Sequence, residues 1–207
     1  KHKLFTKLTG IALAAALTIP STASAVDLKI GALPIGTSWY VFGATLAKLL
    51  QPELPPGSNV EGVGKGGGVG NPIAVDTGKE ELALSNVATS VWAWQGDEEV
   101  YKGKQYRNIR ALVGGLNPVW VFAMLREDYI KDSGNDTLEK ALFSKEDAPR
   151  IVMKPAGSSV PPIVDLFLGA MGTSREQIKA NGGEIIQVAA NQIPAIIRDG
   201  RADLYFE

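Results

Sequence analysis

Apolar positions near the start of the chain change from a strand pattern to a helix pattern. Leu28–Leu33 is a short apolar run typical of a buried strand, and a glycine turn follows it at 34–38. Tyr40–Leu50 then has apolar residues at the i, i+4, i+7 and i+8 spacing of one helix face, namely Phe42, Leu46, Leu49 and Leu50. Pro52 ends this helix. The pattern therefore predicts a strand, a turn and an amphipathic helix.

Strands and helices continue to alternate along the rest of the chain. Strands are expected at Asn59–Val63, Leu82–Val87, Arg110–Leu116, Val119–Arg126, Ile151–Lys154, Glu184–Ala189 and Ala202–Phe206. Helices are expected at 71–78, where Asn71 is the N-cap and Pro72 the first helical residue, within 127–149, at Pro161–Met171 and at Asn191–Asp199. This alternation predicts an α/β fold with right-handed crossovers.

Two predicted elements carry specific packing expectations. Val119–Arg126 is apolar on both alternating faces, which is typical of a strand covered on both sides in a mainly parallel sheet. The inner face of the Pro161–Met171 helix is expected to carry Ile163, Leu166, Phe167 and Ala170. We expect two lobes, 26–118 and 119–207, joined near Gly115–Pro118. Because the chain stops at Glu207 on a predicted strand, we expect it to be truncated at its C-terminus.

The first 25 residues have the pattern of a cleavable export signal. Lys1, Lys3 and Lys7 precede the apolar stretch Leu8–Ile19, and Ala23-Ser24-Ala25 offers small residues at the positions that signal peptidase accepts. At about 12 residues the apolar stretch is too short to span a bilayer as a helix. A buried N-terminal helix or a retained anchor is the alternative. Cleavage after Ala25 predicts a periplasmic protein.

Composition argues for binding rather than catalysis. Without Lys1, Lys3 and Lys7 the formal net charge falls from −1 to −4, which disfavours a nucleic-acid partner because such partners require a basic face. The only histidine is His2, and the chain has no cysteine. The region after the predicted signal therefore cannot form a Ser-His-Asp triad, a cysteine nucleophile or a zinc site with histidine or cysteine ligands. We expect no cofactor and no metal.

Two strand–turn–helix junctions are candidate anion sites. In Gly36–Tyr40, Thr37 or Ser38 can cap the helix and Trp39 or Tyr40 can wall a pocket, although an ordinary N-cap with a core aromatic explains the motif equally well. Gly157-Ser158-Ser159 repeats this arrangement before the second-lobe helix. Lys154 precedes that turn and either attracts a carboxylate or is a solvated surface lysine. Two such turns facing each other would form an anion clamp.

The glycine-rich segment Gly62–Gly70 is a weaker candidate. It contains a GxGxxG match, but so many glycines make the match nearly unavoidable, and Gly66 stands where a P-loop requires Ser or Thr. It is either a backbone-lined loop that faces a small solute or a flexible loop. Ser85 and Asn86 lie at the C-terminal end of the predicted strand Leu82–Val87, where open α/β sheets bind ligands; otherwise they bond to the local backbone.

The order of these motifs resembles the TAXI family of solute receptors of tripartite ATP-independent periplasmic (TRAP) transporters. Four segments carry the resemblance: IGALPIGTSWYVFGATLAKLL, VGKGGGVGNPIAVDTGKEELALSNVA, NIRALVGGLNPVWVFAMLRED, and APRIVMKPAGSSVPPIVDLFLGAMG with IIRDGRADLYFE. The resemblance implies a two-lobed, type II-like periplasmic-binding fold, a small carboxylate ligand such as glutamate, glutamine or a 2-oxo dicarboxylate, and a TRAP-type membrane permease as partner. It also implies that the first lobe is incomplete, because the family's return segment is missing.

The resemblance also implies the ligand contacts. By position these are Ser38, Trp39, Tyr40, Gly67, Gly68, Val69, Ser85, Asn86, Gly157, Ser158 and Ser159. Gly68 stands where the family often has Ser, Asn86 where it often has Asp, and Trp39 where Tyr is usual, so the solute preference is open. Three alternatives remain: a receptor for an ABC transporter or membrane sensor, a structural surface protein, and a secreted enzyme. The enzyme would need a lysine or carboxylate within hydrogen-bond reach of a cleft hydroxyl, and a bond from Lys154 to Ser158 or Ser159 would favour it.

Overall fold

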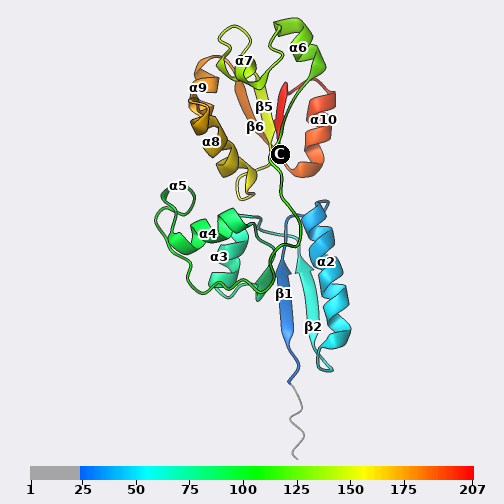
Figure 1. Ribbon diagram of the computed structural model, residues 1–207. Helices are drawn as coiled ribbons and strands as arrows, with labels where there is room; N and C mark the ends of the chain where they lie inside the picture. Colours follow the sequence, from blue (N-terminus) through cyan, green and yellow to red (C-terminus); the bar gives the residue numbers. More distant parts are fainter. Residues whose placement is uncertain (1–23) are drawn as a thin grey trace, which may run out of the picture.

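Two α/β lobes, joined by an extended segment, make up the computed structural model, which describes residues 24–207 (Figure 1). Each lobe has its own sheet, and the two sheets share no strand. The predicted export signal lies almost entirely outside the described residues and stays a prediction. Within the described residues, no helix is both long and apolar enough to cross a membrane.

The first lobe contains a parallel sheet in the order β2-β1-β3. Its strands are β1 (Asp27–Gly31), β2 (Asn59–Val63) and β3 (Leu82–Ala83). Its helices are α2 (Ser38–Leu50), η1 (Gln51–Glu53), α3 (Gly70–Asp76), α4 (Val87–Gln95) and α5 (Glu98–Tyr101). α2 packs beside β1 and β2, whereas α3, α4 and α5 lie at the other side of the lobe (Figure 1).

Small residues, rather than the predicted leucine and phenylalanine face, bring α2 onto its sheet. Gly43 and Ala47 are the buried residues of this helix, whereas Phe42 and Leu49 are exposed. The approach is close, because a Cβ added to Gly62 of β2 would lie 2.9 Å from the backbone nitrogen of Ala44. The predicted face is therefore wrong for Phe42 and Leu49. Leu46 and Leu50 do pack against the Ile30, Ala47 and Val60 core.

The second lobe contains a four-stranded sheet in the order β4-β7-β5-β6. Its strands are β4 (Ala123–Leu125), β5 (Arg150–Met153), β6 (Glu184–Gln187) and β7 (Leu204–Phe206). Only β4 runs antiparallel to its neighbour. Its helices are α6 (Glu127–Ser133), α7 (Leu138–Phe143), α8 (Val160–Ala170), α9 (Arg175–Ala180), η2 (Ala190–Gln192) and α10 (Ile193–Arg198).

Helices cover both faces of this second sheet. Val164 and Leu168 of α8 pack in one core with Ile151 and Met153 of β5, whereas α10 packs on Val152 in another. α8 and α10 accordingly lie on opposite sides of the sheet in Figure 1. The predicted inner face of α8 is displaced, since Leu166 is 61% exposed while Val164 and Leu168 are buried.

The expectation for Val119–Arg126 is also wrong. Only Ala123–Leu125 forms a strand, and it pairs on one side alone, with β7. Val119–Phe122 are between 43% and 75% exposed, so this apolar run is not a strand covered on both sides, although the ring of Phe122 packs edge-to-face on that of Tyr205. No strand forms at Arg110–Leu116, which is part of the extended connection. α10 begins at Ile193 without a side-chain cap, so Asn191 is not its N-cap.

The two lobes repeat one topological unit that the sequence does not reveal. In each sheet the first parallel strand lies between the second and the third, with Ile30 opposite Leu82 in one lobe and Ile151 opposite Leu204 in the other. The turns before the third strands also match, because Gly78 and Gly200 have φ values of +68° and +69°. This arrangement confirms the expected two-lobed, type II-like α/β fold.

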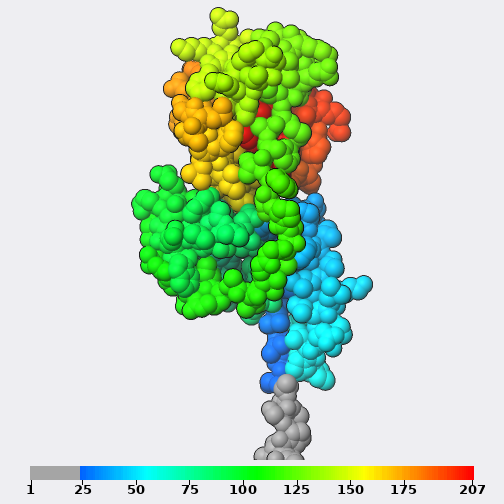
Figure 2. Space-filling view, in the orientation of Figure 1, coloured from blue at the N-terminus to red at the C-terminus, as the bar shows by residue number. Residues whose placement is uncertain are grey.

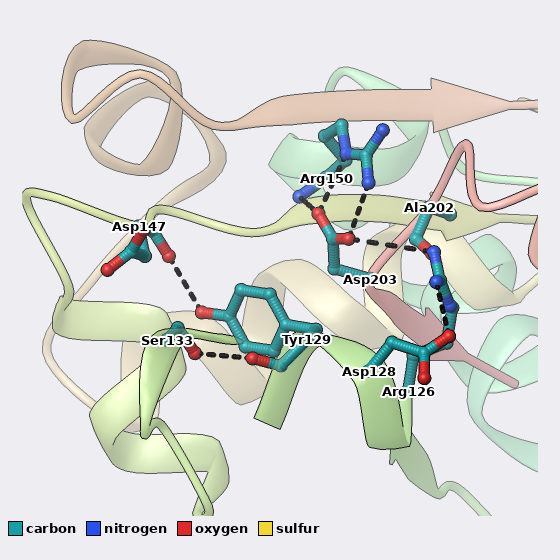
Figure 3. A network of polar contacts seen from close by, with 8 residues as sticks. All are labelled: Arg126, Asp128, Tyr129, Ser133, Asp147, Arg150, Ala202 and Asp203. Carbon is teal, nitrogen blue, oxygen red and sulfur yellow. Dashed lines mark hydrogen bonds and ion pairs between the residues drawn. The ribbon is translucent and has the colours of Figure 1, made fainter. Parts of the chain in front are cut away.

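A network of ion pairs ties the second lobe together at the N-terminal end of β5 (Figure 3). Arg150 donates three hydrogen bonds to the carboxylate of Asp203, from its backbone N–H at 3.0 Å, from Nε at 2.8 Å and from a terminal guanidinium nitrogen at 2.6 Å. Arg126 donates to the carbonyl of Ala202 at 3.2 Å and lies 4.0 Å from Asp203. Nearby, the hydroxyl of Tyr129 donates to the carbonyl of Asp147. The network joins β5, β7 and the residue that follows β4.

Candidate functional site

A cleft of about 290 Å³ lies between the lobes and is lined by residues from both. The first lobe and the connection contribute Leu33, Gly36, Thr37, Ser38, Trp39, Gly68, Asn86, Val119, Trp120 and Val121, and the second lobe contributes Lys154, Ser158, Ser159, Val160, Ile163, Val164, Ala190, Tyr205 and Glu207. In Figure 2 the connecting segment, in green, passes over the face shown between the two lobes.

The N-terminus of α2 opens into this cleft. Thr37 caps the helix, since its hydroxyl accepts from the backbone N–H of Tyr40 at 3.2 Å and donates to the carbonyl of Pro34 at 2.8 Å. Ser38 and Trp39 are the first two helical residues, so their N–H groups have no carbonyl partner within the helix. Both line the cleft. These donors and the positive end of the helix dipole favour an anion here.

The N-terminus of α8 faces the same cleft with fewer donors. Ser159 precedes the helix and makes no side-chain cap, and Val160 is its first residue. Pro161 and Pro162 follow, and proline has no backbone N–H. Val160 is thus the only residue of this first turn that can donate to a ligand. Residues of the two predicted turns do meet at the cleft, where the start of α2 offers more backbone donors than the start of α8. The anion clamp itself stays a prediction.

Lys154 lies at the second-lobe wall of the cleft and is paired with an acid. Its Nζ donates to one carboxylate oxygen of Glu207, and the hydroxyl of Tyr205 donates to the other. Burial and then the bond to Glu207 raise the pKa of the Tyr205 hydroxyl, so it stays protonated at neutral pH. The positive charge of Lys154 is therefore balanced locally. Trp39, Trp120 and Tyr205 place aromatic surface around the same space.

Asn71 holds the glycine loop that borders the cleft. Its side chain is fully buried, and its amide nitrogen donates to the carbonyls of Leu84, Ala32 and Gly31 at 2.7, 3.2 and 3.3 Å. Its amide oxygen accepts from the N–H of Gly67 at 2.9 Å. The prediction that Asn71 is the N-cap is wrong: α3 begins at Gly70, and Asn71 lies inside it. One side chain thus joins the ends of β1 and β3 to the loop.

The lobes also touch each other directly beside the cleft. The amide of Asn86 donates to the hydroxyl of Ser159 at 2.7 Å, across the two lobes. The N–H of Val69 donates to the carbonyl of Gly157 at 3.2 Å. A Cβ added to Gly67 would lie 2.6 Å from that same carbonyl oxygen, so this loop approaches the second lobe more closely than a side chain permits.

A family model matches residues 30–206, nearly the whole of the described chain. The chain belongs to the NMT1-like family. The comparison with curated proteins finds no relative.

Two solved structures resemble this NMT1-like protein at low sequence identity. The alkanesulfonate-binding protein SsuA from Xanthomonas axonopodis pv. citri, bound to MOPS, is 13% identical with a TM-score of 0.44, covering 86% of this chain and 53% of that one. The periplasmic aliphatic sulphonate binding protein SsuA from Escherichia coli is 14% identical with a TM-score of 0.42, covering 88% and 54%. The NMT1-like chain thus spans about half the length of each.

The structure brings some of the predicted contact residues of the NMT1-like protein into the cleft and leaves others out. The cleft lining includes Ser38, Trp39, Gly68, Asn86, Ser158 and Ser159. It does not include Tyr40, Gly67, Val69, Ser85 or Gly157. Tyr40 packs instead near Gly64, where an added Cβ would lie 3.3 Å from its ring, and Ser85 accepts from the hydroxyl of Ser90 at 2.7 Å.

Several cleft residues of the NMT1-like protein were not anticipated from the sequence. Tyr205 and Glu207 lie at the carboxyl end of a parallel strand, so the rule that singled out Ser85 and Asn86 also applies to them. Trp120 lines the cleft from the connection, where its exposure of 75% contradicts the predicted buried strand. No local pattern distinguishes a hinge tryptophan from a core one, so only the arrangement of the lobes reveals it.

Proposed function

We propose that this NMT1-like protein is an exported receptor that captures a small carboxylate in the cleft and presents it to a membrane permease. The observation that carries the proposal is the pair of free N–H groups, on Ser38 and Trp39, that open into a cleft lined by both lobes. The volume of about 290 Å³ is at the small end of the usual range for ligand pockets, and a metabolite of amino-acid size matches it.

The charge of the solute is held mainly by the first lobe. α2 has 13 residues, so its N-terminus carries the full partial positive charge of a helix dipole beside two unpaired donors. Lys154 lines the cleft from the second lobe, where it is paired with Glu207. This ion pair offers one positive and one negative group, which suits a ligand that has both signs of charge or extra hydrogen-bonding groups. Trp39, Trp120 and Tyr205 pack on the carbon skeleton.

In the described part of the chain, the alternative of a secreted enzyme that uses a cleft serine lacks the bond to Lys154 that it requires, and the one cleft hydroxyl that meets a carboxylate is that of Tyr205, which donates to Glu207. Activation of a serine by Lys154 needs a hydrogen bond between them. Lys154 pairs with Glu207, Ser158 donates to the carbonyl of Pro155 at 3.0 Å, and Ser159 accepts from Asn86. None of these serine hydroxyls has a base as its partner in the described residues.

The permease partner is proposed to be of the TRAP type, on the resemblance of the four sequence segments to TAXI receptors. A receptor for an ABC transporter or a membrane sensor uses the same cleft and is the second candidate. Uptake in cells distinguishes the transporters, because a TRAP system requires an ion gradient and continues when ATP hydrolysis is blocked and the gradient is maintained. Loss of uptake under that condition would favour the ABC alternative.

Thermal unfolding against a solute panel tests the binding proposal. The panel contains amino acids, 2-oxo acids, dicarboxylates and, as a second class of anion, alkanesulfonates. A ligand at 100 times its Kd stabilises by about 2.7 kcal/mol, which raises the Tm by roughly 5–11 °C for a chain of this size. A shift with one carboxylate class and no consumption of it supports the proposal. A shift with sulfonates alone, or with nothing, contradicts the carboxylate assignment.

A matched pair of variants tests the helix-end donor itself. Ser38→Pro removes one N–H at the first helical position, where proline is well tolerated, and Thr37 already has the extended backbone that a residue before proline adopts. Losing one hydrogen bond to a charged group weakens binding by roughly 10- to 100-fold. The control Ser38→Ala keeps the N–H and is expected to bind normally. Equal affinity of both variants would remove this N–H from the site.

A further inference from the structure

The contact between Asn86 and Ser159 differs from the other polar groups at the cleft because its two ends belong to different lobes. Asn86 precedes α4 in the first lobe, and Ser159 precedes α8 in the second. The bond between them, from the Asn86 amide nitrogen to the Ser159 hydroxyl oxygen, is 2.7 Å long, and Ser159 makes no helix-capping bond. These two residues were predicted to contact the solute, yet here each contacts the other.

A second bond lies beside the first and is anchored on the first-lobe side. The N–H of Val69 donates to the carbonyl of Gly157, while the carbonyl of Val69 lies 3.0 Å from the hydroxyl of the buried Tyr101. The amide oxygen of the buried Asn71 accepts a hydrogen bond from the N–H of Gly67, in the same loop. Buried groups therefore hold the glycine loop on the first-lobe side of the contact.

The absence of side chains in this loop makes the contact possible. A Cβ on Gly68 would lie 2.8 Å from the Cβ of Ser159, and one on Gly67 would lie 2.6 Å from the carbonyl oxygen of Gly157. Both distances are shorter than van der Waals contact allows. A larger residue at either position would push the second lobe away.

We propose that Asn86, Ser159 and the Gly67-Gly68 backbone form a latch that holds the two lobes closed through protein–protein bonds, without a bridging solute. This inference deepens the proposed function, on which it rests for the role of the cleft. The latch sets how much of the protein is closed before a solute arrives, and so scales the apparent affinity for every solute alike. In this proposal Asn86 and Ser159 act as positioning residues through the bond that joins them.

Distance measurements on the full-length protein without solute test the latch. Because the chain has no cysteine, spin labels can be placed on introduced cysteines at Leu49 and Leu166, which are 65% and 61% exposed and belong to different lobes. Asn86→Ala and Ser159→Ala each remove the same neutral hydrogen bond, so each is expected to lower the closed-to-open ratio by about 2- to 10-fold. The double variant is expected to show the same loss as either single variant. The remote Asn181→Ala is the control and leaves the distances unchanged.

Glycine variants give an independent second measurement. Gly68→Ala is expected to shift the distances toward the open form, whereas Gly70→Ala, whose added Cβ meets nothing within 4 Å, is expected to leave them unchanged. Unchanged distances in Asn86→Ala, Ser159→Ala and Gly68→Ala would overturn the latch. Weaker solute binding by Asn86→Ala with unchanged distances would make Asn86 a solute contact instead. A latch response in a protein that binds no carboxylate would refute the proposed ligand class alone.

Discussion

Exchanging one pair of buried residues between the two lobes is expected to stabilise the protein. The register of the parallel strands makes Gly31 equivalent to Val152 and Glu80 equivalent to Ala202. In the second lobe Val152 and Ala202 pack together in an apolar core. In the first lobe the carboxylate of Glu80 fills the same space, because a Cβ on Gly31 would lie 1.8 Å from one of its oxygens.

The expected gain in stability follows from the missing hydrogen-bond partner of the Glu80 carboxylate. It is 8% exposed, and one of its carboxylate oxygens is buried without a hydrogen-bond partner among the described residues. An unpartnered buried polar group costs about 1–3 kcal/mol. Glu80→Ala removes that cost and also the burial of a methylene, about 0.8 kcal/mol, so it gains about 0–2 kcal/mol. Gly31→Val then fills the vacated space, and a buried valine side chain contributes about 1.5–3 kcal/mol.

Three variants and a titration of stability against pH form the assay. Gly31→Val alone is expected to destabilise because it meets the Glu80 carboxylate, whereas a net gain of about 3 kcal/mol in the double variant raises the Tm by roughly 6–12 °C. Burial, followed by the charge of Glu81, raises the pKa of Glu80, although Lys29 opposes the shift. The folded form therefore takes up a proton more readily than the unfolded form, and the advantage of Glu80→Ala shrinks as the pH falls through that raised pKa.

Additive effects of Gly31→Val and Glu80→Ala on the free energy of unfolding would contradict this prediction. If Gly31→Val destabilises equally with and without Glu80→Ala, the two side chains do not compete for one space. An advantage of Glu80→Ala that stays constant from pH 7 to pH 4 would show that the cost does not come from the charge. Ala202→Glu is the reciprocal control in the second lobe, and it should destabilise by a few kcal/mol.

Two further predictions concern other buried polar groups. Asn71→Ala leaves the N–H of Gly67 and the carbonyls at the ends of β1 and β3 without their buried partner, so it should cost about 2–4 kcal/mol and speed amide exchange at Gly67; protection equal to wild type would contradict the anchoring role. For Asp203, burial alone would raise the pKa, but the hydrogen bonds from Arg150 outweigh it and lower the pKa. Its contribution is therefore present above the unfolded pKa of about 3.9 and is lost as the pH falls through the lower folded value. Chemical unfolding of Asp203→Asn, expected to lose about 1–3 kcal/mol at pH 7, should approach wild type in strong acid, and a constant difference would argue against the ion pair.

The alternation of elements was visible in the sequence, and the packing of individual faces was not. Thr37 was one of two expected caps for α2, and it is the residue that caps it. The α2 face was misjudged because Gly43 and Ala47, which allow close approach, score low on any hydrophobic pattern. Asn71 was assigned by its preference for helix ends, whereas the buried strand carbonyls that it satisfies become neighbours only in the folded lobe.

The candidate site was predictable at the ends of its elements and not across the lobes. Ser38 and Trp39 line the cleft because a helix start after a parallel strand always faces that edge. The bond from Asn86 to Ser159 joins residues 73 positions apart in the sequence, and nothing local to either residue indicates it. Tyr205 and Glu207 could have been included by the strand-end rule.

Because Pro161 and Pro162 have no backbone N–H, the proposed capture and release of a solute would depend on different parts of the molecule. Under the proposed function, an arriving carboxylate would gain most of its hydrogen bonds from the first lobe before the lobes meet, because the start of α8 has few donors. The rate of association would then depend on the exposed end of α2 and on the ionic strength of the medium. The rate of release would depend instead on how often the two lobes part. Substitutions in the first lobe would therefore change how fast the solute is found, and substitutions between the lobes would change how long it stays.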